Sequence, residues 1–459
     1  MENIVAALDF GTTKIAAIVG QKTDSGIRIV GYHEVPADGI VRGEVINVQR
    51  VVKSVESAIA NVAKQVETPI REVWVNHCCE RLRQETTVIK KRRTEDDWIT
   101  EEEVEAILNE ARNTRVATSD VVLQAIPQSY NVDDRIGEID PVGMMGSEIE
   151  ADIKLFIGKK SAIGASTMAL SRNNLQEGGS LLRGIASARA TLSENEKELG
   201  VALLDIGAGS SDLVVIKDNI IRHLSIIPCG GNAITEDIRQ LCGIPLKTSE
   251  ELKKQFGSAF APMDNGKRII SIPGTGGTST KEIPSKELAQ IIQARLSEII
   301  KTADHEIQQT GLKDELKAGL VITGGVASTM HIQRLATQLT GLGIRVAWPD
   351  NFVLAESVEK ALTPGGSSAV GLILYAFDQL GDNIPNFEDP QLPADSEQGT
   401  QGTLFYKEDS NLSEGSKDTT NPGQKPAKKP WYDIRKNLGK NIKNLREMDI
   451  FDNNNDNEA

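Results

Sequence analysis

The sequence predicts an α/β protein with two similar lobes, and two observations carry that prediction. Apolar runs that end in Asp-x-Gly and a turn of small residues occur twice, in residues 4–20 and 201–218. Segments with apolar residues at helical spacing follow each of them. At 459 residues the chain is long enough for two or more compact units. A duplicated β-hairpin with helices around it is typical of two lobes that face each other.

Composition and charge narrow the class of protein. Apolar residues make up 39% of the chain and charged residues 25%, as in soluble globular proteins. The 51 basic and 65 acidic residues give a net charge of −14, which argues against nucleic acid as a general partner of the surface. Four cysteines without a C-x-x-C pair predict thiols in a reducing compartment, and five scattered histidines argue against a zinc enzyme.

The N-terminus passes directly into an apolar strand pattern. It lacks the basic segment, apolar core and cleavage site of a secretory signal. No window reaches the ~18 consecutive apolar residues that a bilayer-spanning helix needs. We therefore expect a protein that stays on the cytoplasmic side.

The remaining elements follow the two hairpins in order. Apolar residues at helical spacing predict helices over residues 48–62, 101–111 and 288–307. Thr100 is expected to cap the second of these, with Glu103 completing a capping box. Near the end of the periodic part, GLVITGG predicts a buried strand that breaks into a Gly-Gly turn, followed by a helix from about residue 330.

Each hairpin turn combines an aspartate with glycines and hydroxyl side chains. Glycine lets backbone N–H groups approach a polyphosphate closely. Asp9 and Asp205 lie at the strand ends, where carboxylates could hold the water shell of Mg²⁺. Asp212 closes the second turn and could orient an attacking water, so Asp212 and Asp205 are the catalytic candidates. The other phosphate-binding candidates in the two turns are Gly11, Thr12, Thr13, Gly209, Ser210 and Ser211.

The Gly-Gly turn at Gly324 and Gly325 could let the backbone pass close to an adenine or a ribose. Its alternative is a simple strand-to-helix turn. For the two Asp-x-Gly turns, the alternative is a pair of ordinary tight hairpins. Two such turns in matching contexts, followed by a Gly-Gly turn, favour a nucleotide site.

Three motifs in this order, DFGTTK, DIGAGSSD and VITGGVAS, resemble the actin, Hsp70 and sugar-kinase superfamily. Within it, the blocks KELGVALLDIG and GGNAITEDI are most similar to the FtsA family of bacterial cell-division proteins, and the similarity runs through nearly all of residues 1–380. The resemblance implies an actin-like two-lobe fold of duplicated ribonuclease-H-like domains with an FtsA-type inserted subdomain.

The resemblance also implies a division of the chain into subdomains. The first lobe would comprise residues 1–83 and 163–200, with the FtsA-type insert between them. The second lobe would hold a smaller subdomain that faces the tubulin-like division protein FtsZ. The expected boundaries of the remaining parts are 84–162 for the insert, 201–229 and 306–381 for the second lobe, and 230–305 for the smaller subdomain.

Further site residues come from the resemblance, position by position. Lys14 could neutralise phosphate charge, although a lysine at a strand end is the alternative. Ala208 stands where the family more often has glycine, which puts hydrolysis or close packing there in doubt. Arg295 and Glu298 match positions that face FtsZ, with a solvated helix face as the alternative. The other nucleotide-binding matches are Gly207, Gly230, Gly231 and Asn232.

The implied function is mechanical. Such a protein would bind ATP with Mg²⁺, form filaments with itself, tether FtsZ to the cytoplasmic face of the membrane at the division site, and help to assemble the septum with other division proteins. Any ATP hydrolysis would be slow and regulatory. A small-molecule kinase, an Hsp70-like chaperone and a pilus-assembly protein of the same superfamily are the alternatives.

The chain changes character after residue 381. Residues 382–429 are rich in Pro, Ser and acidic residues without periodicity, which predicts a disordered linker. Residues 430–448 predict a basic amphipathic helix that binds an anionic membrane surface, with docking on a protein as the alternative. Residues 449–459 form an acidic tail. The membrane-facing candidates are Trp431, Ile434, Leu438, Lys440, Ile442, Lys443 and Leu445.

Overall fold

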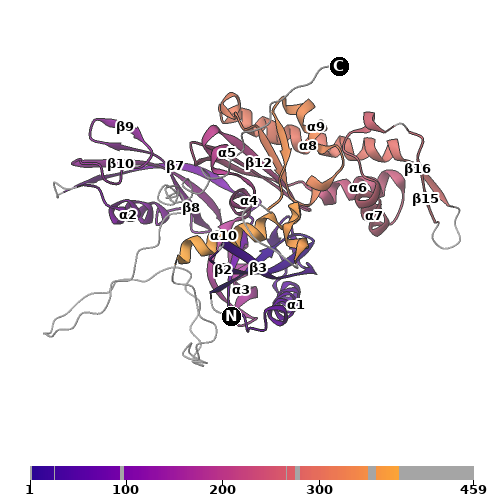
Figure 1. Cartoon of the computed structure of the whole chain (residues 1–459), viewed down its shortest axis with the longest axis horizontal. Coiled ribbons are helices and arrows are strands. Elements are labelled where there is room, and N and C mark those ends of the chain that lie inside the picture. The colour runs from indigo at the N-terminus through magenta and orange to yellow at the C-terminus, as the bar shows by residue number, and fades with distance from the viewer. Residues whose placement is uncertain are drawn as a thin grey trace, which may run out of the picture.

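The computed structural model describes residues 3–24, 26–93, 98–264, 266–273, 280–349 and 358–381. The body is elongated, with two five-stranded sheets at its centre and a smaller unit at each end of the long axis (Figure 1). The predicted linker, amphipathic helix and tail lie outside the described residues.

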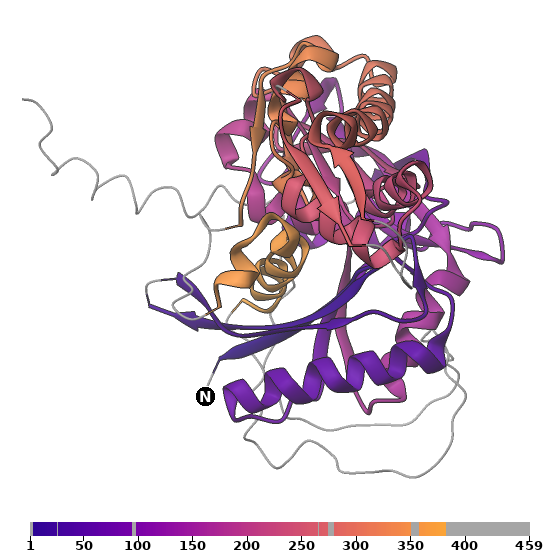
Figure 2. The ribbon, with the colours of Figure 1, turned by 90° about the vertical axis from the view of Figure 1, so that its right-hand side faces the viewer.

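The first central sheet has the order β11-β6-β1-β2-β3 and contains the first predicted hairpin. Its strands β1 and β2 pair antiparallel up to Phe10 opposite Ile15, and β1 runs parallel to β6. The helices α1 and α3 pack on one face of this sheet, and α1 lies along its length in Figure 2. The bounds are β1 Ile4–Phe10, β2 Lys14–Thr23, β3 Gly26–Pro36, β6 Glu72–His77, β11 Gln176–Leu182, α1 Val48–Val66 and α3 Lys160–Ser171, with a small pair β4 Ile40–Val41 and β5 Glu44–Val45.

The second central sheet repeats this arrangement in the order β14-β13-β12-β17-β18. Its hairpin β12–β13 closes at Ile206 opposite Ser211, and β12 runs parallel to β17. The repeat confirms the two similar lobes that the duplicated motif predicted. The bounds are β12 Val201–Ile206, β13 Ser211–Lys217, β14 Ile220–Ile227, β17 Leu320–Thr323, β18 Ile344–Val346 and α9 Ile332–Thr340.

The central strands β1, β12 and β13 are buried on both faces, which explains the unbroken apolar runs in the sequence. Along β12, Val201 and Leu203 face a core shared with the first sheet, whereas Ala202 and Leu204 face α8 and α9. This alternation follows from the two-residue repeat of a strand.

Two helices fill the space between the sheets: α4 (Arg183–Thr191) and α10 (Ser367–Leu380). The helix α10 packs on β1, β2 and β6, while α4 packs on β12 and β13. The two helices cross at Gly371, where an added Cβ would lie 1.8 Å from the carbonyl oxygen of Ala186. This crossing joins the two lobes through one apolar core.

The unit at one end of the molecule is a four-stranded sheet in the order β7-β10-β8-β9, with α2 packed against it. Thr100 caps α2 and Glu103 completes the capping box, as the sequence predicted. The basic run at residues 90–93 lies at the end of β7. The bounds are β7 Arg83–Arg92, α2 Glu101–Arg112, β8 Asp120–Val132, β9 Arg135–Glu138 and β10 Glu148–Lys159.

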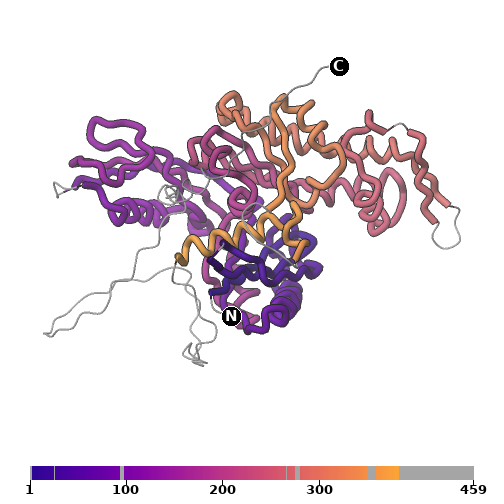
Figure 3. Tube along the Cα trace, viewed as in Figure 1, coloured from indigo at the N-terminus to yellow at the C-terminus, as the bar shows by residue number. Residues whose placement is uncertain are grey.

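The unit at the other end is formed by helices and a two-stranded sheet. The long helix α8 returns from this end to the second central sheet, a path that the Cα trace makes clear (Figure 3). It begins and ends two or three residues beyond the predicted range. The bounds are α6 Gly231–Cys242, α7 Leu246–Phe256, η1 Ala261–Met263, β15 Ile269–Ile272, β16 Lys281–Pro284 and α8 Ser285–Gln309.

The close crossing of α4 and α10 predicts that one added methyl group destabilises the protein at Gly371 but not at Gly164. Gly371→Ala should lower the free energy of unfolding by about 1–3 kcal/mol, because the new Cβ overlaps the backbone of α4. Gly164→Ala, in α3, should be neutral or stabilising by up to about 1 kcal/mol, since no atom lies within 4 Å of its added Cβ. Urea unfolding followed by circular dichroism compares the two; equal midpoints would contradict the proposed tight crossing.

Candidate functional site

The two glycine-rich turns lie against each other at the ends of β1 and β12. A Cβ added to Gly209 would lie 2.4 Å from Thr12 Oγ1 and 2.9 Å from Arg42 Cα, so only glycine fits at this junction. Within each turn, a glycine N–H donates across the loop: Gly11 to the Lys14 carbonyl and Gly207 to the Ser210 carbonyl, both at 3.0 Å. Two turns from different lobes therefore meet at one place.

Several backbone N–H groups at this junction have no acceptor in the described part of the chain. They belong to Thr12 and Thr13 in the first turn and to Ala208, Gly209 and Ser210 in the second. Consecutive N–H groups of this kind form a concavity that suits an anion. The arrangement can hold phosphate oxygens from both sides.

The backbone N–H groups of the turn at residues 230–232 donate to carbonyls of the second phosphate turn. Gly231 N–H donates to the Gly207 carbonyl at 2.9 Å, and Asn232 N–H to the Ala208 carbonyl at 2.7 Å. A Cβ on Gly230 would lie 2.5 Å from the Gly207 oxygen. This turn, which opens α6, therefore fixes the shape of the second turn.

The Gly-Gly turn after β17 lies directly beside the second aspartate. Gly324 has φ +87°, and its added Cβ would lie 2.2 Å from Asp205 Oδ1, so both backbone conformation and space require glycine. Gly325 faces open space within the described structure. An added Cβ on nearby Gly365 would lie 3.7 Å from Lys14 Nζ, so this turn borders the first phosphate turn as well.

Asp9 and Asp205 are both buried and both keep polar partners. Asp9 accepts a hydrogen bond from Asn76 Nδ2, and Asp205 accepts one from Ser187 Oγ at 2.5 Å. Burial raises the pKa of each carboxyl above its ordinary range, and the charge of Asp205 adds to the rise at Asp9. Two mutually repelling carboxylates, one from each lobe, fit a hydrated divalent cation that would bind through water. Among the described residues, no group of three or more His, Cys, Asp or Glu could hold a metal directly.

Asp212 has a different environment from the other two aspartates. Its side chain is 2% exposed and pairs with the guanidinium of Arg183, whose Nε lies 2.7 Å from Oδ2. Burial raises the pKa of Asp212 to about 6 despite the opposing charge of Arg183. The carboxylate that the sequence suggested for orienting water is thus already engaged by an arginine.

The hydroxyl and lysine candidates differ in whether their polar atoms already have partners within the protein. Ser211 Oγ donates to the Cys229 carbonyl at 2.8 Å and is turned away from the junction. Thr12 Oγ1 accepts from Gly43 N–H at 2.9 Å, whereas Thr13 is exposed. Lys14 Nζ pairs with Glu34 on the neighbouring strand β3.

Sequence reasoning missed several residues that support this site. Asn76 at the end of β6 bonds Asp9 and also accepts from Phe10 N–H at 2.7 Å. On α7, Lys253 Nζ donates to the Gly231 carbonyl at 2.9 Å and pairs with Glu250. A polar residue at the end of an apolar strand was the available signal for Asn76; Arg183 and Lys253 have no local signature.

Arg295 and Glu298 lie away from the junction, on α8 in the end unit. Arg295 pairs with Asp237 on α6 through Nε and Nη2, at 2.7 and 2.9 Å, and also with Glu298. Glu298 is the more exposed of the two.

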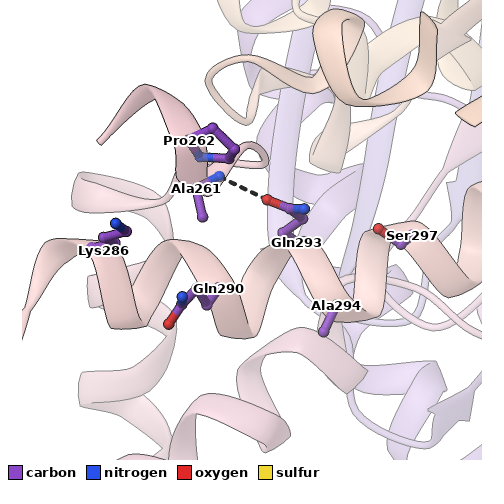
Figure 4. A pocket seen from close by; sticks show the side chains of 7 residues that line it. All are labelled: Ala261, Pro262, Lys286, Gln290, Gln293, Ala294 and Ser297. Atoms are coloured by element: carbon purple, nitrogen blue, oxygen red, sulfur yellow. Dashed lines mark hydrogen bonds between the residues drawn. The ribbon is translucent and has the colours of Figure 1, made fainter. Parts of the chain in front are cut away.

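On the same helix, a cavity of about 450 Å³ lies between η1 and α8 and is lined by Pro262 and polar side chains of α8 (Figure 4). The Ala261 N–H to Gln293 Oε1 hydrogen bond closes one side of it.

The membrane-facing candidates of residues 430–448 lie outside the described residues. Within the described ranges, none of the helices is both long and apolar enough to cross a membrane. Cys78, Cys79, Cys229 and Cys242 are free thiols, as predicted.

The duplicated sheets and the paired turns define a class: the structure has an actin-like fold. It is similar to the solved PilM–PilN type IV pilus biogenesis complex, with a TM-score of 0.59 and 15% identity over 82% of this chain and 98% of that one. It is also similar to MreB5 of Spiroplasma citri bound to ADP, with a TM-score of 0.51 and 15% identity over 83% and 98% of the two chains. At this identity the two matches establish the fold alone.

Sequence comparison places the chain more closely. The model of the cell division protein FtsA matches residues 202–371, and that of the SHS2 domain inserted in FtsA matches residues 80–157. The FtsA of Neisseria meningitidis serogroup B is 31% identical over 84% of this chain and 93% of its own, and that of Bacillus subtilis is 30% identical over 81% and 83%. The chain belongs to the FtsA family of cell-division proteins, which confirms the resemblance and the inserted subdomain.

The raised pKa of Asp205 predicts how stability without nucleotide depends on pH. Because burial raises this pKa above its ordinary value of 3.8, the associated stability is present below about pH 4 and is lost as the pH rises through the folded-state pKa. Asp205→Asn removes this loss. Its stability relative to the unmodified chain should grow from pH 4 to 7, by about 1.4 kcal/mol per unit of raised pKa.

Asp133 supplies the opposite control for this experiment. The backbone N–H groups of Ser147 and Glu148 lower the pKa of its carboxyl, so its contribution is present above the ordinary pKa. Asp133→Asn should therefore lose stability relative to the unmodified chain as the pH rises. Urea unfolding at a series of pH values measures both slopes, and the same slope in both variants would contradict the assignment.

Proposed function

We propose that this protein binds ATP with Mg²⁺ between its two lobes, assembles into filaments, and tethers FtsZ to the cytoplasmic face of the membrane at the division site. Membership in the FtsA family favours this reading over the kinase, chaperone and pilus-assembly alternatives. The observation that carries the nucleotide proposal is the meeting of two turns with unpaired N–H groups between Asp9 and Asp205.

In this proposal the triphosphate lies across both turns. The unpaired N–H groups of residues 12–13 and 208–210 bind its oxygens, and Asp9 and Asp205 hold Mg²⁺ through its water shell. The open backbone at Gly325 suits the adenosine. Without nucleotide Asp212 is paired with Arg183 and must leave this partner before it can act on water, so turnover is slow and regulatory.

A nucleotide that bridges the turns would set the angle between the two sheets. Each turn ends a strand of its own sheet, and the sheets otherwise meet through α4 and α10. A fixed angle gives the end units a fixed relative position, which a filament of repeated subunits needs.

The FtsZ contact is proposed for the end unit that holds α8. The cavity beside Pro262 runs along exposed side chains of α8, a geometry that suits a short helical or extended peptide. Arg295 is paired with Asp237, which leaves Glu298 as the more exposed charge on this part of α8.

Reversing the charge at Glu298 should separate partner binding from folding. Glu298→Lys is expected to weaken co-sedimentation with FtsZ filaments at least about 10-fold through like-charge repulsion, with little change in the unfolding midpoint because the side chain is exposed. Glu251→Lys, the same reversal on the exposed face of α7, is the matched control. FtsZ binding that falls equally in both variants would contradict this face as the contact.

The membrane anchor is proposed from the sequence of residues 425–446, which hold eight Lys or Arg and one acidic residue, Asp433. Each basic residue near an anionic leaflet contributes about 1 kcal/mol. Other division proteins would be recruited to the same assembly.

Truncation tests the anchor directly. A chain ending at Asp382 should fail to co-sediment with vesicles containing anionic lipid, whereas the full chain should pellet with them, because truncation removes the basic segment proposed as the anchor. ATP binding should be equal in the two forms, since all turns of the site lie before residue 382. Equal pelleting of the two forms would remove the anchor from the proposal.

A further inference from the structure

Arg183 is a buried cation at the junction of the two turns. It is the first residue of α4, directly after β11, and its side chain is 8% exposed. The adjacent Gly184 packs against Val214 and Asp212 of β13. The backbone therefore directs this arginine from the first lobe toward the second phosphate turn.

The guanidinium uses only part of its hydrogen-bonding capacity inside the protein. Nε donates to Asp212 at 2.7 Å, and Nη2 donates to Ser210 Oγ at 2.8 Å as well as to Asp212. Nη1 makes no hydrogen bond within the described part of the chain and lies 3.1 Å from the Cβ position of Gly43. One edge of the fork is thus bound to the second turn, and the other carries unused donors.

The charges around the junction are unbalanced. Asp9, Asp205 and Asp212 are all buried, and the cations that act on them are Arg183 and Lys14. Lys14 is already paired with Glu34. A bound triphosphate adds more negative charge at the two turns than one Mg²⁺ balances, and Arg183 is the protein cation placed at the second turn.

We infer that Arg183 binds the terminal phosphate of the nucleotide, exchanging the carboxylate of Asp212 for phosphate oxygens when a triphosphate enters. This inference rests on the proposed function of the site. The planar fork of arginine matches two oxygens of a phosphate as it matches those of a carboxylate, and Asp212 occupies the same donors until phosphate arrives. Ser210, bonded to Nη2, belongs to the turn whose N–H groups face the phosphates.

The exchange would make the site distinguish ATP from ADP. A diphosphate leaves Arg183 on Asp212, whereas a triphosphate offers the missing acceptor for Nη1 and releases Asp212. Arg183 is a phosphate-binding residue in this scheme, because it contacts the terminal phosphate and selects the triphosphate without itself reacting.

The test measures the affinities of the full chain for ATP and ADP, both with Mg²⁺, by isothermal titration calorimetry. Arg183→Gln should weaken ATP binding about 10- to 100-fold, the value of charge-assisted hydrogen bonds to phosphate, and ADP binding less than about 3-fold. Arg345→Gln, which breaks an arginine pair with Glu196 that includes no residue of either turn, should change neither.

A second variant distinguishes phosphate binding by Arg183 from a purely structural role of the Arg183–Asp212 pair. Asp212→Asn keeps the shape of the carboxylate but frees Arg183, so ATP affinity should hold or rise, by up to about 10-fold, relative to ADP. If the pair only braces the turns, both variants weaken ATP and ADP equally, and that result overturns the inference. If the unmodified chain binds neither nucleotide, the proposed function fails before the role of Arg183 is tested.

Discussion

The contact between the turns of two hairpins, where Gly209 leaves room for Thr12, is the constraint on which the rest of the structure depends. Each turn ends the central strand of its own sheet, so the contact fixes how the two lobes meet. It also brings three carboxylates into a buried space. Burial there would be unfavourable for carboxylates without partners, and Asn76 and Ser187 supply neutral donors to the first two while Arg183 pairs with the third.

The electrostatics of the junction suit a site that is stabilised by its ligand. Raised pKa values for the buried carboxyls mean that the charged forms are disfavoured without a cation. A divalent cation would supply the missing positive charge, and the free energy of its binding would then add to the stability of the folded protein. In the proposed function, the same physics links the nucleotide state to the geometry of the lobes.

The end units are positioned by the lobes from which they extend. The insert follows β6 of the first sheet, yet Gln128 bonds the carbonyl of Ile221 in the second sheet at 3.1 Å, and Arg222 donates to the carbonyl of Gln128 at 3.0 Å. At the opposite end, α8 runs from the second sheet to the groove beside Pro262. A change in the angle between the lobes would therefore shift the units at both ends of the molecule.

The sequence by itself determined the two-lobe architecture, because a repeated strand–turn–strand pattern is a local signal. It can be recognised without reference to the rest of the chain. It also located the glycines at the junction, such as Gly209 and Gly324, because glycine in a tight turn after an apolar strand is a local signal of a close backbone approach. Only the tertiary structure decided how the charged groups pair. Arg183 and Asp212 are 29 residues apart, and Asn76 lies 67 residues from Asp9. Such pairs depend on which strands become neighbours, and no local pattern encodes that.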